Sequence, residues 1–211
     1  MESTPARRSG EWRVASGVYF TVHSPLSTPH CVIDACCLID LLATGHVEAI
    51  LRAAGLDWHL PSAVEGEVQH VRQHDLTQPG QFLKVAVDLT PLKTSGVLPV
   101  CAPGDQTEQD RFVHYAAQFR SDGEAMCIAI AEQRGWVVAT DDRKAIRVAQ
   151  QAGLTVVSCP ELVKRWADAT KPDQATLHKV LQDIQVLVQF KPNSSMPEYQ
   201  WWVDELAKAP P

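Results

Sequence analysis

The stretch that decides the fold is CVID (residues 31–34), a short apolar run that ends in an acidic residue. Such a run is typical of a strand that is buried on both faces of a parallel sheet. A second run of this kind, WVVAT (residues 136–140), is followed directly by Asp141 and Asp142. Two buried strands with acids at their carboxyl ends therefore define the centre of the predicted sheet.

Helical and strand-like segments alternate on both sides of these two runs. Short loops between alternating helices and strands indicate an α/β fold with a mostly parallel central sheet. After Pro160 the pattern is helical only, so we expect a leader over 1–29, a domain over 30–160 and a helical C-terminal extension over 161–211. The expected helices span 36–42, 46–54, 63–74, 109–119, 123–134, 142–152, 161–169, 173–190 and 198–208, and further strands span 57–60, 154–157 and, in the leader, 18–22. Residues 82–89 and 97–101 are expected to form a hairpin or two edge strands.

Composition places the chain among soluble globular proteins. Of its 211 residues, 45% are hydrophobic and 21% charged, and no apolar run approaches the ~20 residues of a membrane-spanning helix. No secretory signal is recognisable, and the six cysteines form no CxxC pair, so we expect buried free thiols in a reducing cytoplasm. Neither the cysteine nor the histidine spacing predicts a zinc site. The net charge of −6 argues against a protein that coats nucleic acid, but it does not exclude a nuclease.

Acidic residues occur where separate segments should meet. Ligands of open parallel sheets bind beyond the carboxyl ends of the strands, which is where Asp34 and the Asp141-Asp142 pair are expected. Glu67 lies in the helix after the second predicted strand, and Glu124 lies in the first turn of the helix that follows Gly123. Each acid also has a structural explanation taken alone, because Asp142 can cap a helix and Glu124 suits a helix N-terminus.

Clustered carboxylates would serve a definite chemistry. Like charges a few ångströms apart resist joint ionisation, and a divalent cation such as Mg²⁺ relieves this repulsion and prefers oxygen ligands. One or two metals held by carboxylates can orient a phosphodiester and activate a water. The acids therefore predict a metal-dependent hydrolase.

The arrangement resembles the PIN-domain family over residues 31 to 159. VIDA (32–35) followed by LID (38–40) is similar to the family's opening motif, and PSAVEGEV (61–68) to its second motif. DGEA (122–125) with IAIA (128–131) looks like the third motif, and VATDDRKA (138–145) looks like the fourth.

The resemblance implies a PIN-like three-layer fold and a divalent-metal-dependent endoribonuclease, often the toxin of a toxin–antitoxin pair. It implies Mg²⁺ or Mn²⁺ as cofactor, an RNA substrate, an antitoxin partner, a homodimer and a cytoplasmic location. The implied catalytic residues are Asp34, Glu67, Glu124 and Asp142, the implied metal ligands Asp34, Glu124, Asp141 and Asp142, and the candidate substrate contacts Thr140, Arg143 and Lys144.

Some assignments stay open at this stage. The fourth motif usually reads Thr-x-Asp, which favours Asp142, although Asp141 could serve instead or as well. Asp122 is expected to cap its helix, leaving Glu124 as the ligand, and Asp40 is expected to be a solvated or helix-pairing charge rather than a metal ligand. The apolar face of the helix over 173–190 must be buried, with a dimer interface as one possible destination, whereas Trp201-Trp202 should pack within the chain.

Two alternative functions compete with the nuclease. The first is a PIN-like module without catalysis that serves in binding or assembly. The second is a phosphatase of the haloacid dehalogenase type, which needs an Asp-x-Asp pair after the first strand. Ala35-Cys36 follows Asp34 here, so the second alternative is weak.

Overall fold

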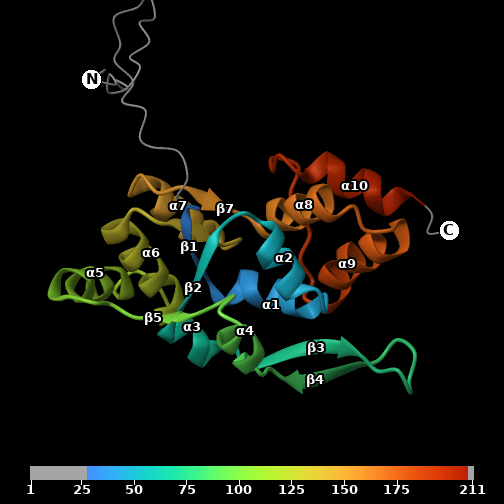
Figure 1. Cartoon of the computed structure of the whole chain (residues 1–211), viewed down its shortest axis with the longest axis horizontal. Coiled ribbons are helices and arrows are strands. Elements are labelled where there is room, and N and C mark those ends of the chain that lie inside the picture. The colour runs from blue at the N-terminus through green and yellow to red at the C-terminus, as the bar shows by residue number, and fades with distance from the viewer. Residues whose placement is uncertain (1–27, 209–211) are drawn as a thin grey trace, which may run out of the picture.

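The computed structural model describes residues 28–208, so the strand expected over 18–22 lies outside the described residues. The chain has an α/β fold built on a five-stranded sheet with the order β5-β2-β1-β6-β7 (Figure 1). Every neighbouring pair in this sheet is parallel. The strands are β1 (His30–Ile33), β2 (Asp57–Pro61), β5 (Val100–Cys101), β6 (Val137–Ala139) and β7 (Val156–Val157).

The strand order reverses between β1 and β6, which are central and adjacent. From β1 the chain proceeds outward to β2 and β5, and it then crosses back to β6 and continues to β7 on the other side. The register pairs Ile33 with Ala139, so the two strands end level with each other. This reversal point is where α/β sheets bind ligands. It confirms that the two apolar runs lie side by side with their acidic ends together.

Helices cover both faces of the sheet, an arrangement compatible with a three-layer α/β fold. Helix α6 (Asp122–Arg134) packs against β1, β2 and β6, and it also contacts α5 (Gln106–Ala116) and α7 (Arg143–Gln151). These three helices lie together at the left of Figure 1. The other group contains α1 (Ala35–Ala43), α2 (Val47–Ala53) and α8 (Cys159–Thr170), with α2 packed on α8.

The segment after β2 differs from the sequence prediction. The helix expected over 63–74 ends early, as α3 (Ser62–Glu67), because Val68 leaves helical geometry with ψ at 74°. Residues His70–His74 instead form β3, which pairs antiparallel with β4 (Phe82–Ala86). The hairpin is therefore β3–β4, and the expected partner at 97–101 supplies β5 to the main sheet, after the short helix α4 (Thr90–Thr94).

The C-terminal helices pack on the same chain. The apolar face of α9 (Gln174–Leu187) is buried, and α9 contacts α1 and α10 (Tyr199–Ala207). Trp202 is fully buried, as predicted, and lies edge-on to Phe190. The face of α9 that suggested a dimer interface is thus covered within the chain.

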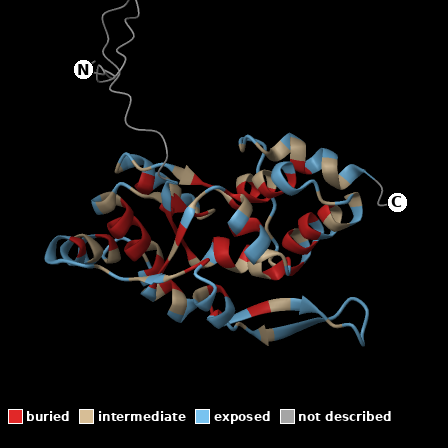
Figure 2. Cartoon of the chain, viewed as in Figure 1, coloured by how far each residue is buried: buried red, intermediate tan, exposed pale blue. Residues whose placement is uncertain are grey.

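Burial is concentrated around the sheet and its flanking helices, whereas the β3–β4 hairpin is largely exposed (Figure 2). The cysteines follow this division in part: Cys31, Cys37, Cys127 and Cys159 are buried as predicted, but Cys36 is exposed. Among residues 28–208, no helix is long and apolar enough to cross a membrane.

Candidate metal centre

Asp34 lies at the carboxyl end of β1 and is almost completely buried. Its side chain caps α1 by accepting from the backbone N–H of Cys37 at 2.8 Å, and its own N–H donates to the carbonyl of Ala139 in β6 at 3.0 Å. Burial raises the pKa of Asp34 to about 6, against the hydrogen bonds that lower it, and the charge of Asp142 raises it further. The carboxylate is therefore held rigidly in a site that opposes its negative charge.

Thr140 connects the ends of the two central strands. Its hydroxyl donates to Oδ2 of Asp34 and accepts from the backbone N–H of Asp142 at 3.2 Å. Because Thr140 is fully buried, its hydroxyl positions the Asp34 carboxylate and does not reach a substrate directly. The predicted substrate contact at Thr140 therefore has no support from this geometry, in which the hydroxyl is used to hold the Asp34 carboxylate.

Asp142 begins α7, as the helix-cap interpretation predicts. Its Oδ1 accepts from the backbone N–H groups of Lys144 and Ala145, both at 2.8 Å. Capping and metal binding are compatible uses of one carboxylate, because the cap occupies one oxygen in these contacts and each carboxylate has two. The cap fixes the side chain beside Asp34.

Glu67 reaches the same edge from α3 through contacts with the start of α6. Its Oε1 accepts from the Ser121 hydroxyl at 2.7 Å and from the Gly123 backbone N–H at 2.8 Å. A Cβ at Gly123 would lie 2.6 Å from Oε2 of Glu67. A larger residue here would force the Glu67 carboxylate to shift, and Glu67 occupies the positive end of a helix dipole.

Glu124 stands in the first turn of α6, as predicted, but the capping residue is Ser121 and not Asp122. Burial is the main cause that raises the pKa of Glu124, and the charges of Asp142, Asp34 and Glu67 raise it further. The charges of the other three predicted catalytic acids therefore all act on Glu124. We call this set of Asp34, Glu67, Glu124 and Asp142 the acid edge.

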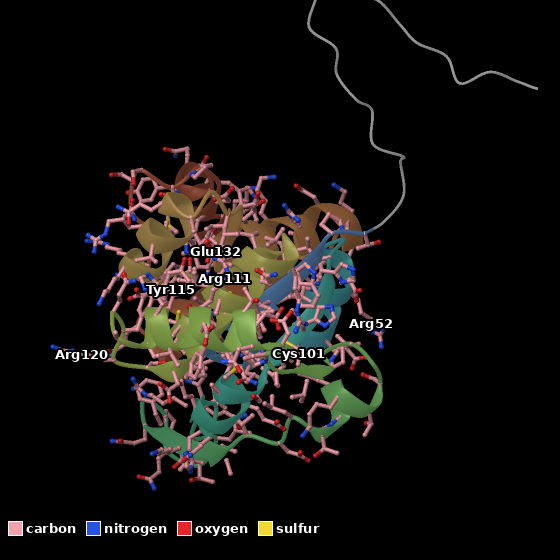
Figure 3. All side chains as sticks on the ribbon, turned by 90° about the vertical axis from the view of Figure 1, so that its left-hand side faces the viewer. Arg52, Cys101, Arg111, Tyr115, Arg120 and Glu132 are labelled. Carbon is pink, nitrogen blue, oxygen red and sulfur yellow. The ribbon has the colours of Figure 1, made fainter. Side chains whose placement is uncertain are left out.

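Helix α6 is fixed in place by α5. Tyr115 donates a hydrogen bond from its hydroxyl to Glu132 at 2.9 Å, and Arg111 forms an ion pair with the same carboxylate. The three side chains are labelled together in Figure 3, where Arg120 projects outward from the loop before α6. This clamp orients the helix that carries Glu124.

The carboxylate of Asp141 contacts the start of α8 and lies beside Asp40 and Cys159. Its Oδ2 accepts from the backbone N–H of Cys159 at 2.9 Å, whereas Oδ1 is buried without a hydrogen-bond partner among the described residues. Burial raises the pKa of Asp141 to about 7. Asp40 lies beside it and is only 7% exposed, so of the two expectations for Asp40 the solvated charge was wrong.

The two basic residues predicted to contact the substrate differ in how far their side chains are already engaged by other groups. Arg143 and Lys144 are both exposed, but Lys144 also donates to the carbonyl of Gln118 and lies over the ring of Phe119. Arg120 is also exposed and lies next to the Ser121 that holds Glu67. Sequence reasoning missed both Arg120 and Ser121, and only the capping preference of serine before a helix could have pointed to Ser121.

The donor set at the acid edge suits a hard cation. It consists of carboxylate oxygens alone, which Mg²⁺ and Mn²⁺ prefer. Besides burial, the charges of the other three acids raise the pKa of Glu124. Within residues 28–208, two groups bring three ligand atoms within 4.8 Å of one another, and neither consists of acid-edge residues. Those groups are Asp40, Asp141 and Cys159, and His30, Asp57 and His59.

Comparison with known proteins does not identify a family: no protein-family model matches the chain, and no curated protein matches its sequence.

Proposed function

We propose that this protein is a divalent-metal-dependent endoribonuclease of the PIN type, with its active centre at the acid edge. The observation that carries the proposal is the presence of four carboxylates from separate segments around the reversal point of a parallel sheet, with Asp34, Glu67 and Asp142 anchored by backbone N–H groups. The order and spacing of the four motifs support the same reading. A bound Mg²⁺ or Mn²⁺ would polarise the scissile phosphate and make an attacking water more acidic.

The residues of the chain have distinct parts in this proposal. Asp34, Glu124 and Asp142 would hold the cation, since Asp34 and Asp142 are fixed by backbone N–H groups and Thr140. Glu67 carries a further charge on the rim, held by Ser121 and Gly123. It would orient the attacking water and accept its proton, so no side chain is needed as a covalent nucleophile.

Exposed cations near the acid edge would bring the RNA to it. Arg143 and Arg120 flank the edge on α7 and on the loop before α6, and phosphate contacts of this kind position a substrate without reading its sequence. The chain as a whole is acidic, at −6, so we expect local contacts and weak, salt-sensitive binding. An antitoxin that covers these cations, and a homodimer, are part of the same proposal.

The test is cleavage of a labelled RNA by the full-length protein with and without Mn²⁺. We expect Asp34→Asn to lower the rate at least about 100-fold, because metal-borne charge stabilisation is worth several kcal/mol and about 1.4 kcal/mol changes a rate tenfold. The chain supplies a matched pair in α3: Glu67→Gln should impair cleavage, whereas Glu65→Gln should not, because Glu65 pairs with Lys93 at 2.5 Å. Activity that persists in EDTA, or in Asp34→Asn, would contradict the proposal.

A non-catalytic module of the same fold is the second candidate. The observation in its favour is that the ligand atoms of the acid edge are less tightly grouped than those of the other two groups in the described part of the chain. This candidate predicts RNA binding without cleavage at any Mn²⁺ concentration, together with insensitivity of that binding to Asp34→Asn.

A further inference from the structure

The amino-terminal edge of the sheet carries a polar group that the proposed nuclease does not use. His30 is the first residue of β1, and Asp57 is the first residue of β2, its partner in the parallel register. His59 is two residues beyond Asp57, so both side chains leave the same face of the sheet. Neighbouring strands of a rigid sheet thus bring together two imidazoles and a carboxylate, which we call the histidine edge.

The three ligand atoms have metal-like spacing. Nδ1 of His30 lies 2.8 Å from Oδ2 of Asp57 and 3.0 Å from Nε2 of His59. Nε2 of His59 lies 3.8 Å from the same carboxylate oxygen. A point equidistant from these atoms lies about 2 Å from each and in their plane, which matches Zn–N and Zn–O bond lengths. Tetrahedral coordination would require the two closest pairs to move slightly apart, and the exposed side chains of His30 and Asp57 leave room for that movement.

Aromatic packing fixes the imidazole rings in this arrangement. The ring of Trp136 stacks on His59 with centroids 4.2 Å apart and on His30 with centroids 5.0 Å apart. The guanidinium of Arg134 lies over the ring of Trp136, 4.8 Å from its centroid. An ion pair with Glu108 holds Arg134 in this position. Support of this kind predefines ligand orientation before a metal binds.

We propose that His30, Asp57 and His59 bind a divalent transition cation of the Zn²⁺ class. Two neutral imidazoles and a carboxylate are a ligand set for Zn²⁺, with a fourth position open to water because His30 and Asp57 are about half exposed. Burial lowers the pKa of His59, and a metal coordinates the neutral form of the ring. The bound cation would join β1 to β2 at the end opposite the acid edge.

The histidine edge and the acid edge differ in the metals that their ligand atoms prefer. Imidazole nitrogen suits Zn²⁺, Co²⁺ and Ni²⁺, whereas an all-carboxylate set suits Mg²⁺ and Mn²⁺. The proposal therefore does not depend on the nuclease activity. It can hold where the nuclease proposal fails, and the reverse is also true.

The test is titration of the full-length protein with ZnCl₂ by calorimetry and with CoCl₂ by visible absorption. We expect one tetrahedral Co²⁺ spectrum that Zn²⁺ displaces, and thermal unfolding shifted upward by Zn²⁺. His30→Ala and Asp57→Asn change half-exposed residues and should fold. Each should lower Zn²⁺ affinity at least about 100-fold, more than the loss of an outer contact.

Two controls make the result decisive. His70→Ala removes an exposed histidine from β3 and should leave the Co²⁺ spectrum unchanged. Asp34→Asn disables the acid edge and should also leave it unchanged. The proposal is overturned if no Zn²⁺ binds, if the Co²⁺ spectrum survives both His30→Ala and Asp57→Asn, or if Asp34→Asn abolishes it, because in the last case the metal occupies the acid edge.

Discussion

The two ends of the same sheet carry polar groups that are built in different ways. The acid edge assembles four carboxylates from segments that span residues 34 to 142, and helix caps and a buried threonine hold them. The histidine edge needs only two neighbouring strands, and their register places its residues. The positions of the histidine-edge residues follow from the pairing of two strands. The positions of the acid-edge residues depend on every helix and strand end that contributes a carboxylate.

Electrostatics also differ between the two edges. At the acid edge, burial and neighbouring negative charges raise the pKa of Asp34 and Glu124. At the histidine edge, one carboxylate lies between two imidazoles, so charge repulsion is absent from that group when the rings are neutral. A cation is therefore needed to relieve repulsion at the first edge only, which makes metal removal a way to separate them.

The largest expected effect comes from Glu124→Gln. Loss of one carboxylate should remove high-affinity Mn²⁺ binding and reduce RNA cleavage at least about 100-fold, while Zn²⁺ binding at the histidine edge is unchanged. Asp122→Asn is the control on the same helix, since Asp122 is exposed in the first turn. Mn²⁺ affinity from titration and single-turnover cleavage rates test this. Equal losses of Mn²⁺ affinity and cleavage rate in the two variants would show that Glu124 has no specific role in metal binding.

A smaller effect, on the free energy of unfolding, is expected from Asp40→Asn. This variant tests how much a buried charge near the carboxyl ends of the strands destabilises the protein. Burial raises the pKa of Asp40 to about 8 from 3.8. An acid with a raised pKa in the folded state takes up protons on folding, so stability is lost as pH rises from about 4 to about 8. The variant should therefore be more stable than the wild type at pH 8, by roughly 1–3 kcal/mol, with no gain near pH 4.

Urea unfolding across that pH range provides the measurement for Asp40→Asn. Asp168→Asn is a suitable control, because Asp168 is exposed and pairs with Lys164 on the surface of α8. A variant whose stability gain is the same at pH 4 and pH 8 would show that Asp40 does not titrate in the way burial requires.

The smallest expected effect comes from Gly123→Ala. A Cβ at this position displaces the Glu67 carboxylate and weakens its hydrogen bonds to Ser121 and Gly123. We expect a loss of roughly 1 kcal/mol in the free energy of unfolding and a modest decrease in cleavage. In Gly66→Ala the added Cβ meets nothing within 4 Å, so this control in α3 should be neutral or slightly stabilising. Equal stability and cleavage rates in Gly123→Ala and Gly66→Ala would contradict the close approach of the Glu67 carboxylate to Gly123.

The central strands and their acids were predictable because two features coincide at them. The apolar runs at 31–34 and 136–140 are short and uniformly apolar, which is typical of buried strands, and β1 and β6 confirm them. Topology then brings Asp34 and Asp142 together. The β3 strand was missed because Val68 and Val71 have helical spacing, and only its pairing with β4 distinguishes a strand.

Two features of the sites could not be predicted from the sequence: the direction of side chains at the acid edge and the strand register at the histidine edge. Adjacent acids 141 and 142 look equivalent in sequence, but the backbone turns Asp141 toward Cys159 and leaves Asp142 at the acid edge. The histidine edge could not be found by spacing, since 27 positions separate its first pair of partners, His30 and Asp57, and only the β1–β2 register joins them.

The most direct test of the nuclease account is an anomalous difference map from crystals grown with MnCl₂. The account predicts a peak at the acid edge, with oxygens of Asp34, Glu124 and Asp142 as its ligands, and no such peak in Asp34→Asn crystals. A map without density there, or with Mn²⁺ only beside Asp40 and Asp141, would contradict the assignment of the acid edge as the metal centre.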